Sequence, residues 1–124
     1  MARPQQPGLT ENELDVMQAL WAHAPLKVAE LLERLKRNPK PAYTSLLTLV
    51  QTMERKGYIA HEQDGKAYAY FPKLKLDSFM KTEIKRVTKR LFNGSPLALA
   101  MSLVKEEHLT QSEIKQLKQL LEGK

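Results

Sequence analysis

Two stretches in the opening third of the chain carry apolar residues at helical spacing. The first follows Thr10 and Glu13, a pair with the spacing of a capping box, and predicts a helix over about residues 10–23. The second predicts a helix over about residues 27–37, with leucines on one side, charged residues on the other and Pro39 beyond its end. Both helices are therefore expected to turn an apolar face towards a core.

A third helix is predicted over about residues 43–56, because Gly57 can take the positive φ that commonly follows the end of a helix. Its two sides differ in chemistry when the residues are placed on a helical wheel. The apolar side consists of Leu46, Leu49, Val50 and Met53. The opposite side is a polar stripe without acids, made of Thr44, Thr48, Gln51 and Arg55. A stripe of this kind can face water or an anionic partner.

Beyond the third helix the pattern changes to a period of two. Residues 58–62 and 66–71 are predicted to be strands, joined by a turn at Asp64-Gly65. Three helices followed by a two-stranded hairpin describe a winged helix-turn-helix, in which the third helix enters the major groove of DNA and the hairpin is the wing. We therefore expect a mostly α fold with a small β-hairpin wing, and a DNA-binding domain over residues 9–75.

The last third of the chain is predicted to be a helical module over residues 76–124. Asp77, Ser95 and Thr110 are expected to cap its three helices. The segment over residues 97–104 is apolar nearly all round, so three such helices make a poor core alone, and we expect a second copy of the chain to cover them in a homodimer. The expected dimerisation residues are Leu91, Leu97, Leu99, Ala100, Met101, Leu103, Val104, Ile114, Leu117 and Leu121. In the alternative, the module folds back on the winged domain in a monomer.

Charge and composition narrow the class of protein. The chain has 20 Lys and Arg against 14 Asp and Glu, a net charge of +6 that favours a polyanionic partner. It has no cysteine and three scattered histidines, so no disulfide, metal site or small-molecule cofactor is expected. No motif places a nucleophile beside a base, which argues against an enzyme. Without a signal peptide or an apolar run long enough to span a membrane, the protein is expected to be cytoplasmic.

The polar stripe of the third helix is the expected DNA-reading face, because that helix comes directly before a wing. Gln51 can pair with the edge of adenine, and the hydroxyls of Thr44 and Thr48 suit phosphates or base edges. Between Lys27 and Lys56 there are seven basic and three acidic residues, which surrounds the stripe with positive charge. The expected DNA contacts are Tyr43, Thr44, Ser45, Thr48, Gln51, Arg55, Lys56 and Lys66.

Several of these positions have a second interpretation. Ser45 and its neighbour could simply cap the third helix, and Tyr43 could pack beside the second helix instead of binding a phosphate. Leu47 could contact a thymine methyl group or cover the rim of the core. His61 on a wing strand could suggest a metal or a pH switch, but no further ligands accompany it. The basic segment over residues 81–90 could extend the DNA footprint or be the solvated side of an amphipathic helix.

These segments, taken together, resemble the penicillinase-repressor type of bacterial transcriptional regulators, the BlaI/MecI group. The segments that carry the resemblance are residues 9–21, 42–49, 54–59, 64–68, 91–95 and 109–113. The resemblance implies a homodimeric repressor that binds a near-palindromic operator in double-stranded DNA through two winged domains. The copper-sensing relatives carry a cysteine-rich tail, which this chain lacks.

The resemblance also implies a mode of release. In the family, repression commonly ends when the dimerisation module is cut, in response to a membrane sensor with a metalloprotease domain that detects β-lactams. The corresponding position here is Ser102-Leu103, where the best-known members carry Asn-Phe. The sequence therefore favours a DNA-binding repressor, with control of β-lactam resistance genes implied by the resemblance. The alternative is a winged-helix adaptor that binds other proteins and has only non-specific affinity for nucleic acid.

Overall fold

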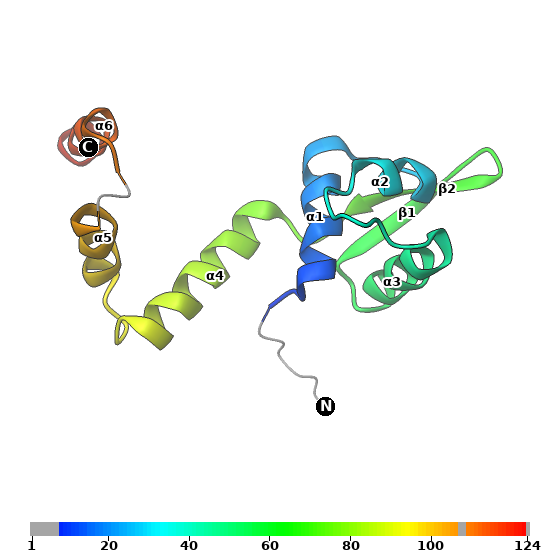
Figure 1. The fold of residues 1–124 in the computed structure, drawn as a ribbon, viewed down its shortest axis with the longest axis horizontal. Coiled ribbons are helices and arrows are strands. Elements are labelled where there is room, and N and C mark those ends of the chain that lie inside the picture. Colours follow the sequence, from blue (N-terminus) through cyan, green and yellow to red (C-terminus); the bar gives the residue numbers. More distant parts are fainter. Residues whose placement is uncertain (1–7, 107–108, 124) are drawn as a thin grey trace. The chain divides into compact units, whose positions relative to one another are not determined.

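Six helices and one β-hairpin make up the part of the chain that the structure, a computed structural model, describes, namely residues 8–106 and 109–123. The elements are, in order, α1 (Glu11–His23), α2 (Val28–Arg34), α3 (Tyr43–Arg55), β1 (Ile59–Asp64), β2 (Ala67–Pro72), α4 (Leu76–Leu91), α5 (Pro96–Lys105) and α6 (Gln111–Glu122) (Figure 1). They divide into two compact units, one ending at Met80 and the other beginning at Lys81. The boundary falls within α4, whereas the sequence places it just before that helix.

The first helix begins where the capping box predicts. The Thr10 hydroxyl accepts a hydrogen bond from the Glu13 amide at 3.1 Å, and the Glu13 carboxylate accepts one from the Thr10 amide at 3.0 Å. These bonds satisfy two of the amide groups that a helix leaves unpaired at its start. From this start α1 turns Val16, Met17 and Leu20 into the core, where they are almost completely buried.

The second helix is shorter than the sequence predicts, because it ends at Arg34 and not near residue 37. Two groups beyond it account for the early end. The Lys40 ammonium donates hydrogen bonds to the carbonyl oxygens of Leu32 and Glu33, which would otherwise continue the helical ladder. The Arg37 guanidinium binds the Asp15 carboxylate of α1, which takes the chain away from the helix axis.

The third helix ends as predicted, at a glycine with positive φ. Gly57 has φ +89°, and the amide of Tyr58 then bonds to the Met53 carbonyl. On the core side of α3, Leu46, Val50 and Met53 are almost completely buried. The predicted two-faced helix is thus confirmed on its apolar side.

The hairpin pairs β1 with β2 in an antiparallel register, with Asp64 opposite Ala67 across the predicted turn. Each strand begins one residue later than predicted. A short bridge adds Leu26 to the sheet, where its amide and carbonyl groups bond to Tyr70. The bridge holds the base of the hairpin against the loop before α2, while the turn extends away from the helices (Figure 1). Ile59 and Tyr70 are therefore buried with the helical core.

The unit that begins at Lys81 holds most of α4, all of α5 and all of α6. Ser95 caps α5 and Thr110 forms a capping box with α6, as predicted. Asp77 is not a cap, because α4 begins at Leu76 and Asp77 lies inside its first turn, where a negative charge suits the helix dipole. Neither α5 nor α6 has a buried residue.

Candidate nucleic-acid interface

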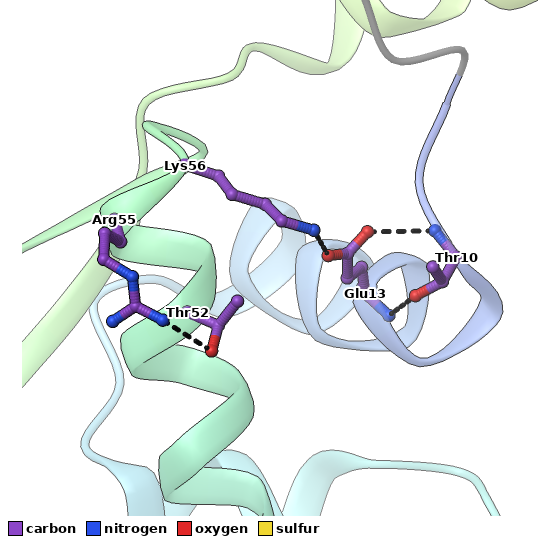
Figure 2. Close-up of polar contacts among 5 residues, drawn as sticks. All are labelled: Thr10, Glu13, Thr52, Arg55 and Lys56. Atoms are coloured by element: carbon purple, nitrogen blue, oxygen red, sulfur yellow. Dashed lines mark hydrogen bonds and ion pairs between the residues drawn. The ribbon is translucent and has the colours of Figure 1, made fainter. Parts of the chain in front are cut away.

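The polar stripe of α3 is exposed along the length of the helix. Thr44, Thr48, Gln51 and Arg55 are all exposed, in contrast to the buried residues of the opposite side. Their side chains share one face because they stand three or four positions apart. Arg55 makes one long hydrogen bond, from Nη2 to the Thr52 hydroxyl at 3.3 Å (Figure 2). This bond uses one of the five donors of a guanidinium, so Arg55 can still bind an anion.

The start of α3 offers backbone amides that are not capped by a side chain. The residue at the cap position is Ala42, and no side chain bonds to the first turn there. Thr44 and Ser45 therefore do not cap the helix, and both are exposed. Free amides and the helix dipole favour an anion at such an end. Leu47 lies against the core at its edge, so the structure favours the interpretation in which it covers the core rim.

Lys56 follows α3 directly and is already engaged in an ion pair. Its ammonium donates a hydrogen bond to the Glu13 carboxylate at 2.7 Å, as Figure 2 shows. The Glu13 side chain is 4% exposed, whereas the Lys56 side chain is 48% exposed. The pair joins the start of α1 to the end of α3. Lys56 thus has a structural role that the sequence does not reveal, and its contact with DNA stays a prediction.

The charges of this pair stabilise each other. Burial alone would raise the pKa of Glu13, but the hydrogen bonds from Lys56 and from the Thr10 amide outweigh it and hold that pKa below its ordinary value of 4.5. The hydrogen bond to Glu13 likewise raises the pKa of the Lys56 ammonium above 10.5. Both groups are therefore charged at neutral pH.

A hollow of about 400 Å³ lies between the starts of α2 and α3 and the hairpin. It brings together the predicted contacts Tyr43 and Lys66 with Lys27 and Tyr68, which the sequence did not single out. The alternation of small and aromatic residues along β2 was the available signal for Tyr68. The Lys27 ammonium lies 3.7 Å from the Asp64 carboxylate, and both groups are well exposed. Two cations and two exposed tyrosines therefore line one concave surface.

His61 lies beside this hollow and contacts both α3 and the wing. Its Nδ1 lies 2.6 Å from the Glu54 carboxylate of α3, and its ring stacks on Tyr68 with the ring centres 4.0 Å apart. Within residues 8–106 and 109–123 no three His, Asp or Glu side chains come together as metal ligands. His108 lies outside the described residues. His61 thus links the wing to α3 through Glu54.

The residues predicted to form a dimer expose apolar surface in the single chain. Leu91, Leu97 and Leu121 are 66%, 68% and 73% exposed. The predicted residues Ala100, Met101, Leu103, Val104 and Leu117 are also exposed, while Leu99 and Ile114 are half-buried. Ser102 and Leu103 lie within α5, with Ser102 half-buried and Leu103 exposed. Among the described residues, no helix is both long and apolar enough to cross a membrane.

Comparisons with known proteins agree with this architecture. A family model described as "Penicillinase repressor" matches residues 9–123. The penicillinase repressor of Bacillus licheniformis is 26% identical over 120 residues, which cover 94% of this chain and 91% of the relative. The methicillin resistance regulatory protein MecI of Staphylococcus aureus strain N315 is 22% identical over 116 residues, which cover 94% of each chain.

A solved structure shares the fold. MepR, a transcription regulator of the Staphylococcus aureus multidrug efflux pump MepA, superposes with a TM-score of 0.51 at 19% identity, covering 93% of this chain and 76% of that chain. At this identity the likeness concerns the fold alone. The family match, by contrast, spans almost the whole sequence. The chain therefore belongs to the penicillinase repressor family, which consists of winged-helix transcriptional regulators and not of enzymes.

Proposed function

We propose that this protein is a transcriptional repressor that binds a near-palindromic operator as a homodimer. The observation that carries the proposal is the exposed, acid-free stripe of α3 beside a hollow that Lys27 and Lys66 line. In a winged helix this face enters the major groove, where base edges carry sequence information. Gln51 reads an adenine edge, Thr48 contacts a base edge or phosphate, and Arg55 binds a phosphate at the exit of the helix.

The proposed homodimer is supported by the apolar surface of α5 and α6. These helices bury no residue in the single chain, although they carry several leucines. Burial of one such side chain gains about 1.5–3 kcal/mol, so a second copy placed on these faces gains stability. A symmetric pair also presents two copies of α3, which matches a near-palindromic site.

The proposed regulated genes are β-lactam resistance genes, as the names of the penicillinase repressor and MecI relatives suggest. We further propose release by proteolysis near Ser102-Leu103, through a membrane sensor metalloprotease. A cut there divides α5, which carries several of the proposed dimer contacts. The test is the intact mass of the repressor in its native cells before and after exposure to a β-lactam. Fragments that end within residues 96–105 support the proposal, and an uncut chain during induction refutes this mode of release.

The DNA-binding proposal is tested with a duplex pool of random sequence. The full-length protein is expected to enrich a near-palindromic sequence, and its affinity for that duplex is then measured by fluorescence anisotropy. Gln51→Ala should weaken binding by about tenfold, since one good base contact contributes about 1–3 kcal/mol of discrimination. Gln18→Ala is the matched control, because Gln18 is exposed on α1. Weak binding without any enriched sequence would refute the repressor and favour the protein-binding adaptor.

A further inference from the structure

The hollow between α2, α3 and the hairpin has the chemistry of an anion site. Lys27 from the start of α2 and Lys66 from the hairpin supply positive charge, and the phenols of Tyr43 and Tyr68 add hydroxyl donors. The residues that line it include no carboxylate. Its volume of about 400 Å³ is large enough for a chemical group much bigger than a water molecule.

One wall of this hollow is held in place by a chain of contacts. Glu54 of α3 lies 2.6 Å from the Nδ1 atom of His61, and the His61 ring stacks on Tyr68 with an interplanar angle of 21°. The ring of Tyr70 packs against His61 from another direction, with centres 5.6 Å apart. Tyr70 is almost completely buried. The phenol of Tyr68 is therefore positioned relative to α3, although it belongs to the wing.

Lys27 has a weak competing partner at the edge of the hollow. Its ammonium lies 3.7 Å from the Asp64 carboxylate, and the two side chains are 41% and 60% exposed. An exposed ion pair of this length contributes little stability, so Lys27 can leave Asp64 for an incoming anion at small cost. The Asp64 carboxylate faces water at the turn and can remain solvated.

From this arrangement we propose that the hollow seats one phosphodiester group of the operator backbone, next to the base pairs that α3 reads. Lys27 and Lys66 neutralise its charge, and the Tyr43 and Tyr68 hydroxyls donate hydrogen bonds to its oxygens. The Glu54–His61–Tyr68 chain makes Tyr68 a positioning contact, because it sets the wing relative to α3. This inference rests on the proposed function, since it names the part of the DNA that occupies a second surface. A phosphate contact of this kind fixes the register of α3 in the groove.

The test measures the salt dependence of binding to the enriched duplex for the full-length protein and three variants. Lys27→Met should lower the slope of log affinity against log salt by about 0.9 for each Lys27 in the complex. Tyr68→Phe removes only the hydroxyl and keeps the ring on His61, so it should weaken binding about 3- to 10-fold without changing the slope. Lys36→Met is the matched control, because Lys36 is exposed and lines a different hollow beside α1.

A second measurement locates the phosphate itself. Neutral methylphosphonate groups are placed one at a time along the backbone of the duplex. One position in each half-site should weaken the wild-type complex more than the Lys27→Met complex, because the variant has already lost one of the contacts to that phosphate. Retained folding of each variant is checked by its thermal melting curve.

The outcomes separate the two proposals. If no sequence is enriched by the wild-type protein, the proposed function fails. If a sequence is enriched but Lys27→Met and Lys36→Met lower the slope equally, the lysines act by general attraction and the phosphate seat is overturned. An unchanged affinity in Tyr68→Phe would also overturn it.

Discussion

Removal of Lys56 should destabilise the unit that contains α1 and α3 through the carboxylate it leaves behind. In Lys56→Met the aliphatic stem is kept, but Glu13, which is 4% exposed, loses its charged donor at 2.7 Å. Breaking a fully buried ion pair costs about 3–5 kcal/mol, and an exposed pair contributes about 1 kcal/mol or less. Because the Lys56 side chain is 48% exposed, water can partly replace it, and we expect a loss of about 2 kcal/mol in the free energy of unfolding.

Glu13→Gln should cost less than Lys56→Met. The side-chain amide oxygen that this substitution introduces can still accept the hydrogen bond from the Thr10 amide, and Lys56 can return to water. We expect a loss of about 1 kcal/mol for this variant. In the Glu13→Gln background the further change Lys56→Met should be nearly neutral, because no buried charge then remains to be paired.

The assay is a urea titration at fixed protein concentration, followed by the fluorescence of Trp21. The chain has one tryptophan, and Trp21 packs against the core of the unit that ends at Met80. Its fluorescence therefore reports on that unit. Lys36→Met is the control for the loss of an exposed lysine.

The effect should also depend on pH in a defined direction. The pKa of folded Glu13 is lowered from 4.5, so its pairing stabilises the fold above that value and is lost as the pH falls through the folded pKa. The raised pKa of Lys56 gives stability that is present below 10.5 and lost as the pH rises through the folded pKa. The deficit of Lys56→Met should thus be largest near neutral pH and shrink in acid. A deficit that stays constant into strong acid, or one no larger than that of Glu13→Gln, would show that the loss does not come from an unpaired Glu13 carboxylate.

Three further predictions concern other parts of the chain. Gly57→Ala should lower the free energy of unfolding by about 1–2 kcal/mol in the same urea titration. The cause is backbone strain, because φ at this position is +89° and an added Cβ would contact nothing within 4 Å. Gly57→Asn should recover part of the loss. Thr110→Ala should cost about 1 kcal/mol of helix stability, seen as faster amide hydrogen exchange at the start of α6. Leu97→Asn and Leu121→Asn should raise the dimer dissociation constant at least 100-fold in sedimentation velocity, since each lost leucine counts twice in a symmetric pair at about 1.5–3 kcal/mol. Lys118→Asn, an exposed change on α6, should leave the constant unchanged.

The features of the fold that can be predicted from the sequence are those with local determinants. The capping pairs at Thr10 and Thr110 and the glycine after α3 were found because each depends on residues within a few positions. The early end of α2 was missed because it depends on Lys40 and on a contact between Arg37 and α1. A helical period does not show which distant side chains compete for the last carbonyl groups.

In the candidate site, too, only the part with local determinants can be predicted from the sequence. The exposed stripe of α3 follows from helical spacing and was predicted residue by residue. The hollow was not predicted, because Lys27, Tyr43 and Tyr68 come from three separate elements that meet only in the folded unit. Glu13 shows a further limit. Its spacing from Thr10 predicts a capping role, which is a sufficient reason for a glutamate at this position. The sequence therefore gives no sign of the contact with Lys56, 43 positions away.

The exposed leucines of α5 and α6 bear on how steeply operator occupancy would depend on the concentration of the protein. If only the dimer binds DNA tightly, operator occupancy at low protein concentration varies with the square of the chain concentration. A twofold fall in copy number would then lower the number of pairs by about fourfold. Partial loss of the chain, by dilution during growth or by cutting, would therefore release transcription more steeply than the same loss of a one-chain binder.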